Sequence, residues 1–186
     1  MAIENGYATL DEVKAALRIT DNVDDALLEL AIESASREIE GFCERVFYDV
    51  GTQTRVFQPD DAYVTQIDDL QSLSNLETSS DGTSWDTTWT ASDYQLEPLN
   101  GIAGGLSQPP TRIRAVGDYL FPIWSVLNIN QHEATVRVTG TWGFASVPTA
   151  IKQATVLYSM RQFKRYDSPL GVAGFGDIGA IRVSRF

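Results

Sequence analysis

The longest periodic stretch of the chain is VDDALLELAIESASREIEGFCERV, residues 23–46. Apolar and small side chains recur in it at helical spacing, whereas the glutamates lie mostly on the other side. Asp24 and Asp25 stand in the first turn, where a carboxylate complements the helix dipole. This pattern predicts a long amphipathic helix. Its apolar and small positions are Leu27, Leu30, Ala31, Ser34, Ala35, Ile39, Phe42 and Val46.

Two further helices flank this one in the sequence. Upstream, Thr9-Leu10-Asp11-Glu12 has the spacing of a capping box and predicts a short helix that ends near Arg18-Ile19. Downstream, VPTAIKQATVLYSMRQFKRY (residues 147–166) starts with a proline that suits the first helical position. Its apolar surface extends around the cylinder, so we expect it to be covered on more than one side. Ala31, Ser34 and Ala35 are small enough to let another helix approach closely.

The segment between these helices, roughly residues 50–145, is rich in short alternating runs that predict strands. Asp81-Gly82, between runs at 73–78 and 85–89, is typical of a hairpin turn. Residues 116–130 are expected to form a packed loop. The predicted fold class is α+β: a small helical bundle (1–48 and 147–166), a β-rich insertion (49–146) and an extended C-terminal arm (167–186). Further strands are expected at 52–57, 94–97, 111–116 and 134–140.

Charge is distributed unevenly along the chain. The net charge is −11; residues 1–110 carry 21 acidic and 5 basic side chains, and residues 111–186 carry 4 acidic and 9 basic ones. This balance argues against general nucleic-acid binding through the bulk of the chain. It leaves three readings open: an acidic surface that faces DNA without gripping it, acidic and basic ends that meet in neighbouring subunits, or simple solubility. The single cysteine fits a reducing compartment. We expect no signal peptide and no membrane-spanning segment, because the start lacks a basic region with an apolar core and no apolar run approaches about 20 residues.

Motifs for catalysis or cofactor binding are weak. Gly174-Phe175-Gly176-Asp177-Ile178-Gly179 matches G-x-G-x-x-G by letter, but the chain lacks the following helix and acidic residue that dinucleotide binding needs, so we expect no cofactor. His132 and Cys43 are the only residues of their types, which leaves no usual metal site and only a poorly supported hydrolase around His132. Three aspartate doublets are expected to serve helix starts and loops: Asp24-Asp25, Asp60-Asp61 and Asp68-Asp69.

All four tryptophans fall in the β-rich segment. Trp85 and Trp89 are four residues apart and would share a face of a regular strand, which offers a platform for stacking a sugar. The alternative function is therefore a binding module that recognises carbohydrate or a protein of a virion or host surface. Tryptophans that fill the core of a small sheet explain the same pattern.

A basic cluster ends the last helix and leads into a glycine-rich arm. The cluster comprises Arg161, Lys164, Arg165 and Tyr166, and the arm adds Arg182 and Arg185. A glycine-rich terminus is expected to need a partner for order. With Ile181, Val183 and Phe186 as apolar anchors, the arm suits docking as an extended segment.

Two blocks of the chain resemble the head-to-tail connector (adaptor) proteins of long-tailed bacteriophages. They are YATLDEVKAALRI with DDALLELAIESASREIEGFCERVFY (within residues 7–48), and residues 147–186, which end in RQFKRYDSPLGVAGFGDIGAIRVSRF. The resemblance covers these blocks and not the middle of the chain, and no catalytic motif accompanies it. It implies a virion protein of the head-tail interface, made in the bacterial host cytoplasm, that is not an enzyme.

The resemblance further implies a ring, typically of twelve copies, beneath the portal protein, with double-stranded DNA passing through it without specific binding. The next tail-completion (stopper) protein would bind the ring, and no membrane is involved. The expected portal-docking residues are Arg161, Lys164, Arg165, Tyr166, Phe175, Ile181, Arg182, Val183, Arg185 and Phe186. The expected ring-packing residues are Leu27, Ala31, Ala35, Ile39, Val156, Met160 and Phe163.

Overall fold

The structure is a computed structural model that describes residues 3–81, 84–123, 135–167, 172–175 and 179–182. Helices and strands both contribute substantially, so the predicted α+β class is confirmed. The chain divides into two units: a helical unit, residues 1–47 with 147–186, and a β unit, residues 48–146.

Three α-helices form the helical unit: α1 (Leu10–Leu17), α2 (Asp25–Cys43) and α3 (Thr149–Asp167). The predicted capping box is present at the start of α1. Thr9 Oγ1 accepts from the Glu12 N–H at 3.2 Å, and Glu12 Oε2 accepts from the Thr9 N–H at 2.9 Å. These bonds satisfy two backbone donors that a helix start otherwise leaves without partners. The bounds of all three helices agree with the ranges that the sequence predicted.

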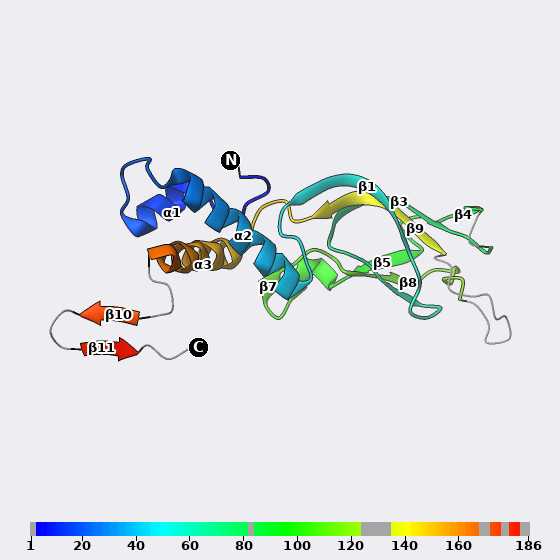
Figure 1. The fold of residues 1–186 in the computed structure, drawn as a ribbon. Coiled ribbons are helices and arrows are strands. Elements are labelled where there is room, and N and C mark those ends of the chain that lie inside the picture. The colour runs from blue at the N-terminus through cyan, green and yellow to red at the C-terminus, as the bar shows by residue number, and fades with distance from the viewer. Residues whose placement is uncertain (1–2, 82–83, 124–134, 168–171, 176–178, 183–186) are drawn as a thin grey trace. The chain divides into compact units, whose positions relative to one another are not determined.

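Helices α2 and α3 lie side by side (Figure 1). Ala31 and Ala35 of α2 and Ser159 of α3 are at most 3% exposed, and the Ser159 hydroxyl lies 3.5 Å from the Ala31 carbonyl oxygen. Small side chains thus allow the close approach that the sequence predicted. The core of the unit contains Ala8, Val13, Leu28 and Ile32, with Val156, Met160 and Phe163 of α3 packed against it.

An ion pair joins α1 to α3. Lys152 Nζ lies 2.9 Å from Glu12 Oε1. The pKa of Glu12 is lowered, first by the hydrogen bond from the Thr9 N–H and then by the bond from Lys152. The same carboxylate therefore caps α1 and ties this helix to α3.

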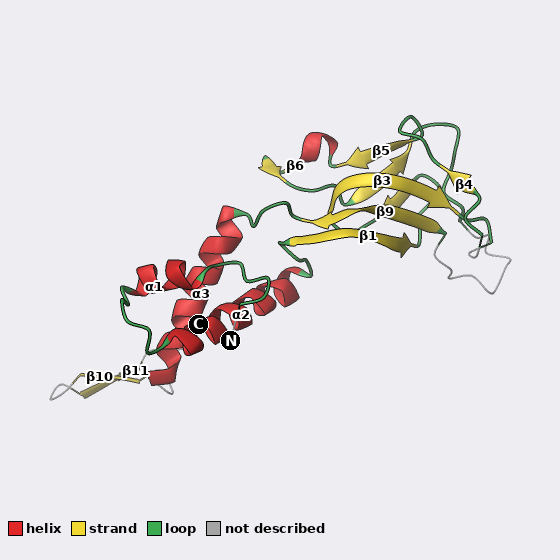
Figure 2. Ribbon diagram, turned by 90° about the horizontal axis from the view of Figure 1, so that it is seen from above, coloured by secondary structure: helices red, strands yellow, loops and turns green. Residues whose placement is uncertain are grey.

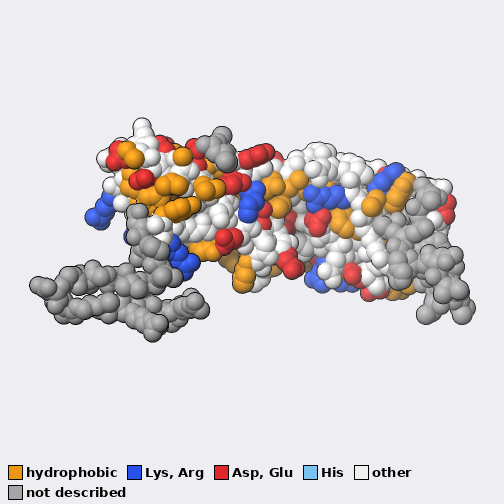
Figure 3. Space-filling model, viewed as in Figure 1, with side chains coloured by type: hydrophobic (Ala, Val, Ile, Leu, Met, Phe, Trp, Pro, Cys, Tyr) orange, Lys and Arg blue, Asp and Glu red, His pale blue; other side chains and the backbone are white. Residues whose placement is uncertain are grey.

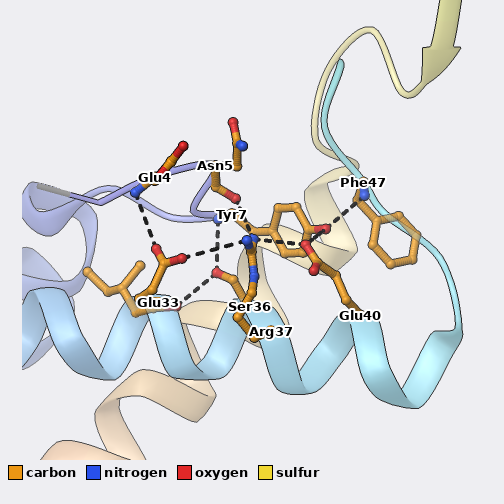
Figure 4. Close-up of polar contacts among 9 residues, drawn as sticks. Glu4, Asn5, Tyr7, Glu33, Ser36, Arg37, Glu40 and Phe47 are labelled. Atoms are coloured by element: carbon orange, nitrogen blue, oxygen red, sulfur yellow. Dashed lines mark hydrogen bonds and ion pairs between the residues drawn. The ribbon is translucent and has the colours of Figure 1, made fainter. Parts of the chain in front are cut away.

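A polar network fixes the N-terminal residues on α2 (Figure 4). The Tyr7 N–H donates to Ser36 Oγ at 3.1 Å, and the Tyr7 hydroxyl donates to Glu40 Oε1 at 2.5 Å. The same hydroxyl accepts from the Phe47 N–H at 2.8 Å. Burial and the bond to Glu40 raise the pKa of Tyr7, so the phenol keeps its proton at neutral pH. Tyr7 thus holds the residue at which the chain leaves the helical unit.

The β unit is built from antiparallel strand pairs. One sheet has the order β1-β9-β3-β4, a second has β2-β8-β5, and β6 pairs with β7. Figure 2 shows β1, β9 and β3 running next to one another. The strands are β1 (Asp49–Phe57), β2 (Val64–Gln66), β3 (Leu70–Thr78), β4 (Thr87–Thr88), β5 (Tyr94–Glu97), β6 (Ile102–Ala103), β7 (Leu106–Ser107), β8 (Arg112–Ala115) and β9 (Val136–Gly143); a 3-10 turn, Leu99–Gly101, precedes β6.

The core of the β unit takes side chains from both larger sheets. Trp142 of β9 and Ile113 of β8 are fully buried within one cluster. The Trp142 Nε1–H donates to the Gln53 carbonyl oxygen at 2.9 Å, so its polar atom is satisfied. The other buried members are Ile67, Leu70, Leu76, Trp89, Phe121, Val136 and Val138.

The strands by which the chain enters and leaves this unit are direct partners. Asp49 of β1 is opposite Gly143 of β9, and the Phe144 N–H donates to the Tyr48 carbonyl oxygen at 3.0 Å. Gly143 has φ 85°, and a Cβ there would lie 2.1 Å from the Tyr48 oxygen. Glycine is therefore required at the point where the two ends of the unit meet.

The predicted hairpin around Asp81 is confirmed, because β3 and β4 pair antiparallel. Phe121 is 1% exposed, as expected for a packed loop, whereas residues 124–130 of that loop lie outside the described residues. Strands β2, β6 and β7 were not predicted. They have only two or three residues each, too few for a periodic pattern.

We expect Gly140→Ala to destabilise the β unit. The added Cβ would lie 2.3 Å from the Ser72 carbonyl oxygen and 2.8 Å from Leu70 Cδ1. The backbone of Ser72 in the sheet cannot shift easily to relieve this overlap. The expected cost is about 1–3 kcal/mol in the free energy of unfolding. Urea unfolding followed by tryptophan fluorescence measures it, since all four tryptophans lie in the β unit.

The matched control is Gly41→Ala on α2, where an added Cβ meets nothing within 4 Å. This change should stabilise the helical unit by up to about 1 kcal/mol, because alanine favours a helix over glycine. Equal effects of the two substitutions would contradict the steric argument.

We expect Tyr7→Phe to destabilise the helical unit by about 1–3 kcal/mol, because it removes a buried hydroxyl that both donates and accepts. Unfolding followed by circular dichroism of the helices measures it. Tyr158→Phe is the control, since its hydroxyl bonds to Glu38 at an exposed site and should cost less than about 1 kcal/mol. A neutral Tyr7→Phe would show that the network does not hold the chain exit.

Candidate functional site

A groove of about 540 Å³ runs between α2 and α3. Phe42 lines it and is 91% exposed, more than any other large hydrophobic residue in the described part of the chain. Glu38 and Tyr158, which also line the groove, are bonded to each other, and the hydrogen bond to Glu38 is the main cause that raises the pKa of Tyr158. The groove is lined by Glu38, Ile39, Phe42, Cys43, Ile151, Ala154 and Tyr158. It is a mainly apolar surface with one acidic residue.

The basic cluster at the end of α3 lies on the surface. Arg161, Lys164 and Arg165 are exposed, and Tyr166 is 58% exposed. Within the described residues, no carboxylate forms an ion pair with these three cations. Most other cations of the helical unit differ: Lys14, for example, contacts Asp25 at 2.6 Å. Among the described side chains, none neutralises the charge of this cluster.

The arm contains a short antiparallel pair of strands, β10 (Val172–Phe175) and β11 (Gly179–Arg182). Phe175 is opposite Gly179, and Ala173 is opposite Ile181. Val183, Arg185 and Phe186 lie outside the described residues. The first and last glycines of G-x-G-x-x-G thus stand in paired antiparallel strands, with no described helix between them, which is not the strand-to-helix turn that binds a dinucleotide.

The expected ring-packing residues fall into two groups. Ala31 and Ala35 are buried in the chain's own helix contact, and Val156, Met160 and Phe163 pack on its own core. The others reach a surface: Leu27 is 37% exposed and Ile39 lines the groove. The structure places Arg161, Lys164, Arg165 and Tyr166 along the C-terminal end of α3, but does not gather the expected ring-packing residues into one exposed patch.

The described residues contain no cluster of histidine, cysteine or acidic side chains that could hold a metal ion. Cys43 is half-buried in the groove wall, and His132 lies outside the described residues. The aspartate doublets serve structure: Asp61 accepts from the Val64 N–H at 2.8 Å, and Asp68 pairs with Arg55 at 2.7 Å. No helix in the described part is long and apolar enough to cross a membrane.

The three tryptophans in the described part of the chain do not form a stacking platform. Trp89 is 4% exposed, stacks on Phe121 at 4.7 Å and donates to Thr78 at 3.0 Å. Trp85 is half-buried against the Arg137 guanidinium, 4.6 Å from the ring centroid. The shared face of Trp85 and Trp89 was the wrong expectation, because β4 spans only Thr87–Thr88 and the chain does not continue as a regular strand. Trp124 lies outside the described residues.

The groove is the feature that the sequence did not reveal. Phe42 lies on the apolar side of the predicted helix, so periodicity placed it in the core with Ile39 and Ala35. Periodicity predicts which side of the helix a side chain is on, but not how far along that side the neighbouring helix extends. The groove opens where α3 begins at Thr149, beside the end of α2.

Two of the comparisons with known proteins find similar proteins. Residues 7–84 match the model of the phage gp6-like head-tail connector protein family. Among solved structures, one chain of "Neck of empty GTA particle computed with C6 symmetry" has 18% sequence identity and a TM-score of 0.56, over 96% of this chain and 88% of that chain. The second match shows a shared fold along nearly the whole chain. A search of curated proteins finds no match.

The family match includes α1, α2 and the first three strands, and so contains the first of the two blocks that carried the sequence resemblance. The fold match extends over the second block as well. The predicted resemblance is confirmed: residues 7–84 of this chain match the model of the phage gp6-like head-tail connector protein family.

Proposed function

We propose that this protein is a head-to-tail adaptor that forms a ring beneath the portal of a DNA-filled capsid and links it to the tail. The family match over residues 7–84 carries the proposal, since it identifies a structural connector. The ring would contain copies of this chain, twelve by the family resemblance. The next tail-completion protein would bind it, and the virion neck would be its location.

The arm is the proposed contact with the portal. It follows directly on the exposed cations of α3, and its two described strands pair only with each other. Extended segments dock by adding backbone hydrogen bonds to a partner, while their side chains fill pockets. Ile181, Val183 and Phe186 supply apolar anchors, and Arg182 and Arg185 supply charge.

The acidic balance suits a channel for DNA. Residues 1–110 carry 21 acidic and 5 basic side chains, so most of the chain repels phosphate. A protein that grips DNA needs lysine and arginine to displace counterions, and each such contact would slow the passing duplex. Double-stranded DNA would therefore pass without specific binding.

For ring packing, Leu27 is exposed and Ile39 lines the groove, so both are accessible to a neighbouring copy. The carbohydrate-binding alternative is not favoured. Trp89 and Trp142 are buried and Trp85 contacts Arg137, so the tryptophans that the structure describes leave no exposed pair of rings for a sugar.

Deletion of residues 167–186 should abolish binding to isolated portal rings, because it removes every proposed anchor of the arm. Binding is measured by co-sedimentation of the purified protein with portal rings. The fold should persist, since both core clusters lie outside the deleted segment.

The control for the deletion is its circular dichroism and tryptophan fluorescence, which should match those of the full chain. A second variant, Arg182→Ala with Arg185→Ala, should bind portal rings more weakly than the full chain at low salt, and its binding should depend less on salt, because it lacks two charges that salt screens. A folded deletion variant that binds portal rings with native affinity would show that the arm is not the docking element.

A further inference from the structure

An exposed apolar patch marks the start of α2. Val23, in the turn before the helix, is 86% exposed, and Leu27 and Leu30 in its first two turns are 37% and 46% exposed. Asp21 and Asp24 flank Val23 in the same turn. We call these five residues the α2 patch. Figure 3 shows hydrophobic side chains gathered on the helical unit where α1 and α2 lie.

A stripe of matching chemistry runs along α3. Leu157 is 54% exposed, and Arg161, Lys164 and Arg165 follow it at spacings of four, seven and eight residues. Residues three and four apart lie on one side of a helix, so the four side chains form a single surface, the α3 stripe. Its leucine offers an apolar contact and its three cations offer charge.

Within one chain, the α2 patch and the α3 stripe neither bury each other's apolar side chains nor form described ion pairs with each other. The apolar residues of both remain between 37% and 86% exposed, and no described carboxylate pairs with the three cations. Other cations of the unit are used internally: Lys14 with Asp25, Arg37 with Glu40, and Lys152 with Glu12. The free charges of the two surfaces are therefore of opposite sign, acidic on α2 and basic on α3.

We propose that the α2 patch of one copy binds the α3 stripe of a second copy. The two surfaces differ, so the contact is head-to-tail, and each copy uses one surface on each side. Leucine and valine side chains would form the centre of the contact, with aspartates opposite arginines and lysine around it. The inference rests on the proposed ring. It assigns Arg161, Lys164 and Arg165 to the neighbouring copy and leaves the portal contact to the arm.

Charge reversal tests the pairing. Arg161→Glu with Lys164→Glu makes the α3 stripe acidic, and Asp21→Lys with Asp24→Lys makes the α2 patch basic. Each double variant alone should associate at least about tenfold more weakly than the wild type, because like charges then face each other. The readout is sedimentation velocity at low ionic strength. The quadruple variant, which combines all four substitutions, should associate again, and so should an equimolar mixture of the two double variants.

Rescue also shows that the variants are folded, since a misfolded chain would not regain association. Absence of rescue in both the quadruple variant and the mixture would overturn the pairing. High salt should weaken the wild-type contact, because it screens exposed charges. Association of both double variants at the wild-type level would also overturn it.

Cysteine cross-linking tests the head-to-tail geometry in a Cys43→Ser background. Val23→Cys chains mixed with Leu157→Cys chains should form a disulfide-linked dimer, in solution or when bound to portal rings. Either variant alone should form none. Cross-linking of one variant with itself would show a two-fold contact and overturn the inference, as would the absence of any mixed dimer in both settings.

Portal binding separates this inference from the proposed function. If charge reversal stops association while co-sedimentation with portal rings persists, the α3 stripe belongs to the neighbouring copy, as inferred. If charge reversal removes portal binding and leaves association intact, the stripe belongs to the portal and the inference fails, while the adaptor function stands.

Discussion

The pairing of β1 with β9 is the constraint on which both units depend. These strands come from opposite ends of the β unit, and their register sets Asp49 opposite Gly143. The chain therefore enters and leaves the unit at neighbouring positions, and about a hundred residues can stand between α2 and α3 without separating them. Gly143 allows this junction, because any side chain there would collide with the Tyr48 carbonyl oxygen.

The helical unit makes use of this closure. Its core needs α3, since Val156, Met160 and Phe163 complete a cluster begun by Val13, Leu28 and Ile32. Ala31, Ala35 and Ser159 let the two long helices approach closely, and Tyr7 secures the exit of the chain at Phe47. Helices far apart in sequence thus form one core only because the strands between them return the chain to its starting point.

Local signals were sufficient for the elements that local physics governs. The capping box at Thr9, the long helix from Asp25 and the Asp81 turn were all readable, because each depends on residues within a few positions. Strand partners were not readable. β9 lies between β1 and β3, but the sequence of its eight residues does not predict which strands it pairs with. The exposure of Phe42 and the burial of Trp89 depend likewise on what distant segments cover, which periodicity alone does not contain.

The uneven distribution of charge gives the helical unit an acidic surface at the start of α2 and a basic surface at the end of α3. Internal ion pairs involve Lys14, Arg37 and Lys152. The cations of the described helices that form no described ion pair therefore lie at the end of α3, and Asp21 and Asp24 lie at the start of α2. Between identical copies, the acidic surface of one attracts the basic surface of the next, whereas two acidic or two basic surfaces repel each other. A head-to-tail contact of this kind closes into a ring when its rotation permits, and it leaves the rest of each copy acidic. In the proposed connector, one charge pattern would therefore orient the subunits and keep the surface facing DNA repulsive.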